Sequence, residues 1–144
     1  PMARYLGIDY GQKRIGVAVS DEDGVIAFPL CVIENSGPQR VLAEIRRIIK
    51  EKTPNGIVVG MPLSLDGSKG IAAVNVERFV EIIKEHINIT VDVWDERLST
   101  RMAERAMIDG GLSRKRRKQS IDQAAAQLIL QSYLDARGGQ KASE

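Results

Sequence analysis

Four acidic residues lie where the sequence predicts strand or helix ends: Asp9 ends the first predicted strand, Asp95 and Glu96 follow the last strand, and Asp122 lies near the start of the last helix. Each alone is as well explained as a turn or cap residue. Together they suit a divalent cation, because clustered carboxylates repel each other unless a cation lies between them. Mg2+ is held by two or three carboxylates plus substrate phosphate, and Mn2+ is the alternative. Such ions catalyse phosphodiester hydrolysis.

Other catalytic chemistries find little support in the composition. The chain has one cysteine, Cys31, and one histidine, His86. Cys31 lies in an apolar stretch and is predicted to be buried, while His86 lies at a predicted helix end. A structural zinc site is excluded by these counts, and a nucleophile paired with His86 is disfavoured.

Hydrophobic periodicity predicts an α/β fold of one domain, residues 1–144, with a polar flexible tail at 138–144. Strands are predicted over 4–10, 15–20, 25–33, 56–60 and 89–94, and helices over 37–52, 72–86, 99–109 and 120–137. Tight turns join the first three strands, which predicts an antiparallel meander. Helices separate the later strands, which predicts parallel pairing. The result is a mixed five-stranded sheet flanked by helices, and its parallel strands would bring their carboxyl ends to one edge.

Basic and glycine-rich segments around the acidic residues favour a polyanionic substrate. Cations beside an acidic site would hold nucleic acid over the metals, and scarce aromatic residues, 4% of the chain, argue against a stacking surface for single strands. The loop 60–70 could bind phosphate through backbone amides or could be a plain edge loop. The residues we assign to substrate binding are Gly11, Lys13, Arg14, Ser64, Lys69, Arg97, Arg101, Arg114, Lys115, Arg116, Arg117 and Lys118.

Four motifs in order resemble the YqgF/RuvX family. They are residues 7–21, 60–67, 94–100 and 113–125, and the resemblance covers about residues 3 to 137. It implies a ribonuclease H-like fold related to RuvC resolvases and a magnesium-dependent nuclease that matures the 5′ end of pre-16S rRNA.

The resemblance also implies the site. The acidic positions of the family correspond to Asp9, the pair Asp95 and Glu96, and Asp122, with Arg97 as a phosphate partner. Because adjacent side chains of a strand point to opposite faces, one of the pair is expected to bind metal. We favour Glu96, whose longer side chain reaches inward, so the expected metal ligands are Asp9, Glu96 and Asp122.

Several alternatives stay open at this stage. The partner is expected to be nucleic acid, pre-rRNA before branched DNA, with no membrane, in a cytoplasmic monomer or homodimer. Resolution of DNA four-way junctions would use the same metal chemistry. A non-catalytic RNA-binding assembly factor is a further alternative. An ATPase of the actin and sugar-kinase type is disfavoured because it needs two such domains.

Overall fold

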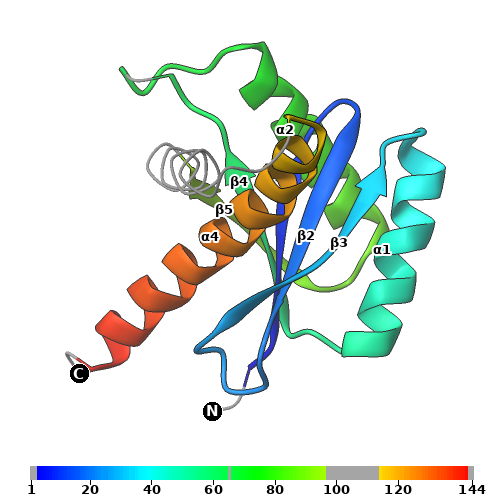
Figure 1. Ribbon diagram of the computed structural model, residues 1–144. Helices are drawn as coiled ribbons and strands as arrows, with labels where there is room; N and C mark the ends of the chain where they lie inside the picture. Colours follow the sequence, from blue (N-terminus) through cyan, green and yellow to red (C-terminus); the bar gives the residue numbers. More distant parts are fainter. Residues whose placement is uncertain (1–2, 65, 97–113, 143–144) are drawn as a thin grey trace.

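A computed structural model describes residues 3–64, 66–96 and 114–142, with the side chains of the last helix described over 124–138 (Figure 1). Its centre is one five-stranded sheet in the order β3-β2-β1-β4-β5. β2 pairs antiparallel with β1 and with β3, whereas β4 pairs parallel with β1 and with β5. The strands are β1 (Tyr5–Tyr10), β2 (Arg14–Ser20), β3 (Ala27–Glu34), β4 (Gly56–Met61) and β5 (Thr90–Asp95). The predicted mixed sheet is therefore confirmed.

Helices cover both faces of this sheet. α1 (Pro38–Lys52) and α2 (Ile71–His86) lie on one face, and the long helix α4 (Arg114–Ala142) crosses the other (Figure 1). Each face has its own apolar core, as expected for a sheet between two helical layers.

β1 shows how the sequence divides its side chains between these layers. Leu6 and Ile8 are buried in the core beneath α1 and α2. Because side chains alternate along a strand, Gly7 and Asp9 face α4. A Cβ on Gly7 would lie 2.7 Å from the Cβ of Leu130. Glycine at this position therefore lets α4 approach the strand that carries Asp9.

Polar contacts fix α4 along the rest of its length. Tyr133 donates a hydrogen bond to Asp92 of β5, and the indole of Trp94 donates one to Ser132 over 2.9 Å. At the other edge of the sheet, Ala27 bonds through both of its backbone polar groups to glutamine side chains of α4. The helix is thus tied to both edge strands, β5 and β3.

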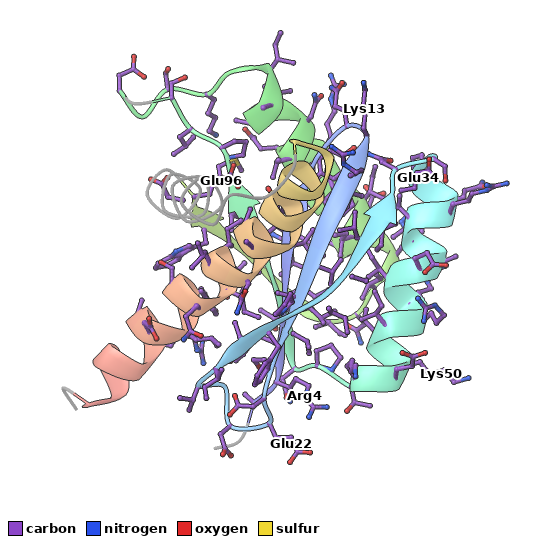
Figure 2. The ribbon with its side chains drawn as sticks, viewed as in Figure 1. Arg4, Lys13, Glu22, Glu34, Lys50 and Glu96 are labelled. Carbon is purple, nitrogen blue, oxygen red and sulfur yellow. The ribbon has the colours of Figure 1, made fainter. Side chains whose placement is uncertain are left out.

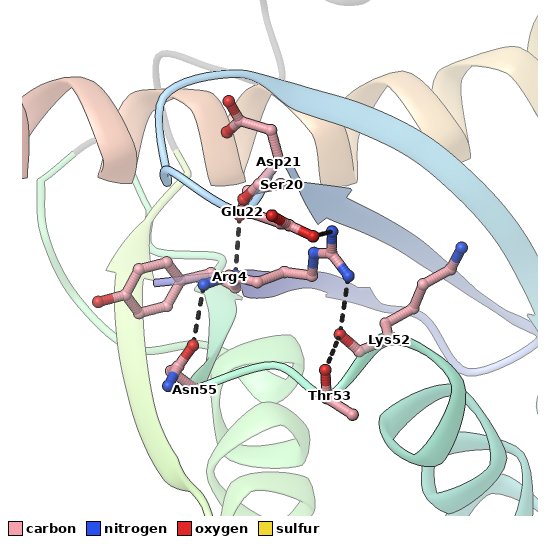
Figure 3. Close-up of polar contacts among 8 residues, drawn as sticks. Arg4, Ser20, Asp21, Glu22, Lys52, Thr53 and Asn55 are labelled. Carbon is pink, nitrogen blue, oxygen red and sulfur yellow. Dashed lines mark hydrogen bonds and ion pairs between the residues drawn. The ribbon is translucent and has the colours of Figure 1, made fainter. Parts of the chain in front are cut away.

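Polar contacts of Arg4 join three segments of the chain (Figure 3), at the end of the sheet away from Lys13 and Glu96 (Figure 2). Arg4 donates to the carbonyl of Lys52, in the last turn of α1, over 3.0 Å, and pairs with Glu22 at 3.5 Å. Its backbone amide donates to the Asn55 side chain over 3.0 Å. Since the last carbonyls of a helix have no partner within it, Arg4 joins the end of α1 to the entry of β1.

The largest differences from the sequence prediction lie at the two ends of the last helix. α4 begins at Arg114, whereas residue 120 was predicted, because arginine, lysine and glutamine favour helix and nothing before residue 120 breaks it. The same helix continues to Ala142, whereas residue 137 was predicted as its last residue. The predicted helix 99–109 lies outside the described residues. Within the described part of the chain, no helix is long and apolar enough to cross a membrane.

Candidate active site at the carboxyl ends of the parallel strands

Glu96 and Asp9 meet at the edge of the sheet where β1, β4 and β5 end. Glu96 follows β5 directly and is half-buried, and Asp9 lies near the end of β1. Burial raises the pKa of Glu96 to about 7, with further contributions from the charge of Asp9, a hydrogen bond to Asp9 and the charge of Asp95. Glu96 is therefore held close to a second carboxylate in a poorly solvated position.

One oxygen of this carboxyl group is buried without a hydrogen bond from any described residue. Oε2 of Glu96 is buried and accepts no hydrogen bond within the described part of the chain. An unsatisfied buried carboxylate oxygen is costly, since burial removes its hydration. The atom lies at the end of the sheet where Figure 2 also shows the Lys13 turn, opposite Arg4, Glu22 and Lys50.

Gly60 creates the room for this arrangement. It lies near the end of β4, between the strands that carry Asp9 and Glu96. A Cβ on Gly60 would lie 2.5 Å from Oε2 of Glu96 and 2.5 Å from Cδ1 of Ile129 in α4. The missing side chain therefore lets Glu96 lie over β4 toward Asp9 while α4 packs alongside.

Strand alternation separates the two acidic residues at the end of β5, Asp95 and Glu96. Asp92 and Trp94 contact α4, and Glu96 continues this series. Asp95 falls on the opposite face and is exposed. The structure thus brings Glu96, and not Asp95, to the face that carries Asp9.

Asp122 belongs to α4, and its side chain lies outside the described set. Helical spacing places residue 122 one turn before Ala126. The backbone of Ala126 lies against β1, with its carbonyl oxygen 3.0 Å from a Cβ placed on Gly7. Position 122 is therefore on the sheet-facing side of α4, toward the end at which β1 reaches Asp9.

The β1–β2 turn holds three of the predicted substrate-binding residues. Gly11 is required by the turn itself, because a Cβ there would lie 2.4 Å from the carbonyl oxygen of Arg14. The Asn35 side chain donates to the Gly11 carbonyl over 2.9 Å, and the Asn35 amide donates to the Lys13 carbonyl over 2.9 Å. Lys13 is exposed and Arg14 is half-buried. The two hydrogen bonds from Asn35 thus hold the turn in place, and the turn carries the exposed Lys13 next to β1, the strand of Asp9.

The loop after β4 uses its amides internally. The amide of Ser64 donates to the Ser68 carbonyl over 3.0 Å, and the Gly67 amide donates back to Ser64 over 2.8 Å. The Ser68 amide donates to the Asp66 side chain over 2.9 Å. Lys69 pairs with Glu77 of α2 at 3.3 Å. These contacts favour a self-contained edge loop over a phosphate cradle.

The basic run opens α4 and does not precede it. Because five consecutive residues span more than one helical turn, Arg114 to Lys118 surround the helix axis, so one substrate surface meets only some of them. Positions 114 and 118 share a helical side with 122. The side chains of this run lie outside the described set. Arg97 and Arg101 lie entirely outside the described residues.

Cys31 and His86 stand in structural settings. Cys31 is half-buried in β3, where burial raises the pKa of its thiol. His86 ends α2, with Nδ1 2.9 Å from the Ile82 carbonyl oxygen. Neither belongs to the acidic site.

Sequence reasoning missed Gly60 as part of the site and missed the contacts that hold α4. Gly60 was visible only as the start of a loop, since its role depends on strand register. Tyr133 follows Ile129 and Ala126 at helical spacing, which was a signal for a buried face but not for a hydrogen bond to Asp92.

Comparisons with known proteins agree with this architecture. The profile of a family described as RuvX, Holliday junction resolvase, matches residues 3–136. A protein of Clostridioides difficile is 45% identical over 132 residues, 92% of this chain and 94% of the relative. A protein of Thermoanaerobacter pseudethanolicus is 44% identical over 135 residues, 93% and 97% of the two chains. Both are named "Putative pre-16S rRNA nuclease".

Solved structures show the same fold at low identity. Thermus thermophilus RuvC in complex with a Holliday junction substrate aligns with a TM-score of 0.60 at 18% identity, covering 94% of this chain and 96% of RuvC. The yeast mitochondrial Holliday junction resolvase Ydc2 aligns with a TM-score of 0.59 at 13% identity, covering 99% and 82%. The fold is therefore the ribonuclease H-like fold of these resolvases. The chain belongs to the RuvX family of nucleases.

Proposed function

We propose that this protein is a Mg2+-dependent nuclease that acts on structured nucleic acid and processes the 5′ end of pre-16S rRNA. The observation that carries the proposal is the half-buried carboxyl group of Glu96 facing Asp9, with one buried oxygen that has no hydrogen-bond partner among the described residues. Such a pair is unfavourable for an isolated protein and favourable for one that binds a cation between its carboxylates.

The donor set fits a hard divalent cation. Both facing groups are carboxylates, which Mg2+ and Mn2+ prefer. No group of three or more histidine, cysteine or acidic ligands occurs within the described side chains, so a third protein ligand would be a residue outside that set. Asp122 of α4 is our candidate for it. When bound, the cation supplies activation of a water molecule and stabilisation of the leaving oxygen of a phosphodiester.

The protein's own residues position the substrate and shape the site. Asp9 and Glu96 would hold the cation, and Gly60 keeps the space between their strands free of a side chain. Lys13, on its braced turn, and the cations that open α4 would contact phosphates on either side of the acidic pair. These contacts bring the nucleic-acid backbone to the edge of the sheet without reading its sequence.

Two features support RNA processing as the substrate assignment. The relatives at 44–45% identity carry the pre-16S rRNA nuclease name. Shape recognition through the backbone is also the ordinary mode for folded RNA. Resolution of DNA junctions is the second candidate, because the family description names it. Symmetric strand cleavage of a junction needs a two-fold dimer.

A paired cleavage assay tests the proposal. The wild-type protein, Asp9→Asn and Asp23→Asn are each incubated with a pre-16S 5′ leader RNA and with a DNA four-way junction, with Mg2+ or with EDTA. Asp23 is an exposed acidic residue of the β2–β3 turn, so Asp23→Asn matches the charge change away from the site. We expect Mg2+-dependent cleavage of the RNA by wild type and by Asp23→Asn only.

The other outcomes separate the alternatives. Cleavage of the junction alone, together with a dimer by light scattering, would assign the protein as a resolvase. RNA binding without cleavage, or equal cleavage by Asp9→Asn, would remove the nuclease assignment and leave a binding protein.

A further inference from the structure

A pocket opens beside the acidic site on the other face of the sheet, between α1 and α2. Its volume is about 240 Å³. Val41, Leu42 and Phe79 form buried apolar walls, and Tyr10 contributes its ring. The Tyr10 and Phe79 rings lie 4.3 Å apart between centroids. Two of the chain's few aromatic residues therefore line one cavity next to Asp9.

Amide and guanidinium groups lie among the residues that line the cavity. Asn35, Asn75 and Arg78 contribute to the lining. The side chains of Asn75 and Arg78 make no hydrogen bond or ion pair within the described residues. Asn75 is half-buried and Arg78 exposed. An aromatic wall combined with available amide and guanidinium donors suits a flat heterocycle that carries both donors and acceptors.

A second hollow lies between this pocket and the β1–β2 turn. It has a volume of about 210 Å³, and Gly11, Gln12 and Ile71 line it. Tyr10 and Asn75 line both hollows, so the two are neighbours. Lys13 belongs to the same turn and is exposed. A nucleic-acid strand that leaves Asp9 would cross this turn before it reaches the pocket.

The size of the pocket limits its occupant. Drug-sized ligands need cavities of roughly 300–1,000 Å³, whereas about 240 Å³ is suited to a single ring system. A lone anion would need little of the apolar wall. The combination of size, aromatic wall and polar groups therefore points to a base and not to a phosphate.

We propose that this pocket binds one unpaired nucleobase of the substrate, from a nucleotide close to the cleaved phosphate. The proposal rests on the nuclease function proposed above and adds to it that the substrate must expose a base at a fixed distance from the cut. Asp9 and Tyr10 are adjacent in β1 and point to opposite faces. The phosphate would lie on the α4 side of the strand while the base enters on the α1 and α2 side.

A metal-free titration tests the pocket independently of cleavage. Isotope-labelled protein in EDTA is titrated with each of the four ribonucleoside 5′-monophosphates and, as a control with the same phosphate and no base, with ribose 5-phosphate. We expect amide shifts for Tyr10, Asn35, Asn75 and Arg78 with at least one nucleotide and none with ribose 5-phosphate. Equal shifts with ribose 5-phosphate would indicate anion binding by Arg78 and overturn the proposal. Nucleotide-induced shifts that occur only at amides outside the pocket would also overturn it.

A second experiment places the base within the substrate. In the Asp9→Asn background, binding is measured for RNAs that carry one abasic nucleotide, moved through the positions flanking the cut. One position should weaken binding roughly tenfold, the order expected for one stacked base. Asn75→Leu, which removes the amide and keeps the branched shape of the side chain, and Arg78→Ala should each reduce that penalty, whereas Lys50→Ala, an exposed charge control on α1, should leave it unchanged.

The outcomes keep the two proposals apart. Cleavage by wild type without any position-specific penalty, or with a penalty unaffected by Asn75→Leu, would refute the base pocket and leave the nuclease intact. Nucleotide binding in EDTA by a protein that cleaves no substrate would refute the nuclease function and leave the base pocket.

Discussion

Replacing Glu96 by glutamine should change how the stability of the metal-free protein depends on pH. The pKa of Glu96 is raised from its usual 4.5 to about 7 in the folded chain. Below pH 4.5 the carboxyl group is protonated in both the folded and the unfolded protein, so its contribution to folding is fully present. Between pH 4.5 and 7 the unfolded chain ionises while the folded chain does not, and stability falls. Above pH 7 the loss is complete.

The size of the effect follows from the shift. Each pKa unit corresponds to about 1.4 kcal/mol, so the rise from 4.5 to about 7 removes about 3 kcal/mol from the free energy of unfolding as the pH rises. Glutamine has nearly the same shape and does not ionise. Glu96→Gln should therefore match wild type near pH 4.5 and exceed it by about 3 kcal/mol at pH 8.

Urea unfolding in EDTA from pH 4.5 to 8 measures this difference, with Glu81→Gln as the matched control. Glu81 is an exposed glutamate of α2, and its substitution should give a difference that does not vary with pH. Adding Mg2+ at pH 8 should stabilise wild type and not Glu96→Gln. A stability difference between wild type and Glu96→Gln that stays constant across this pH range would refute the account of Glu96.

Three further substitutions test the packing around the site. Gly60→Ala should lower nuclease activity and cost about 1–3 kcal/mol of stability, because its Cβ meets two side chains at 2.5 Å. Gly70→Ala is the control, since a Cβ there has nothing within 4 Å. Equal melting temperatures for the two variants would contradict the clash at Gly60. Gly7→Ala should lower both melting temperature and cleavage rate by moving α4, since its Cβ would lie 2.7 Å from a side chain of that helix. Tyr133→Phe should lower the free energy of unfolding by about 1–2 kcal/mol through loss of the hydrogen bond to Asp92. If urea unfolding shows no such decrease, the hydrogen bond makes no net contribution to stability.

The sheet and the first two helices were predictable because local patterns mark them. The buried faces of α1 and α2 recur at helical spacing, and glycine or proline stands at the start of each. The meeting of Asp9 and Glu96 was also predictable, since it follows from parallel strands ending at one edge. These inferences need only element order and strand polarity, which the sequence carries directly.

Other features depend on relations that a single sequence does not display. The start of α4 at Arg114 was missed because its first turns are polar and carry no apolar periodicity. The role of Gly60 depends on the strand register that sets it between β1 and β5. The base pocket draws Tyr10, Asn35, Leu42 and Arg78 from four separate segments, and none of them has a telling neighbour in the sequence.

The placement of α4 makes the acidic site depend on tertiary packing more than on local structure. Gly7 and Gly60 remove side chains from two of the strands that α4 crosses, β1 and β4, and so the helix axis can lie close to the sheet. Closer approach buries Ile129 and Leu130, but it also excludes water from Glu96, whose pKa rises as a result. The packing that stabilises the helix thus creates the unfavourable carboxyl pair. A bound cation would offset that cost, so the folded chain should gain more stability from Mg2+ than an exposed pair of carboxylates would provide.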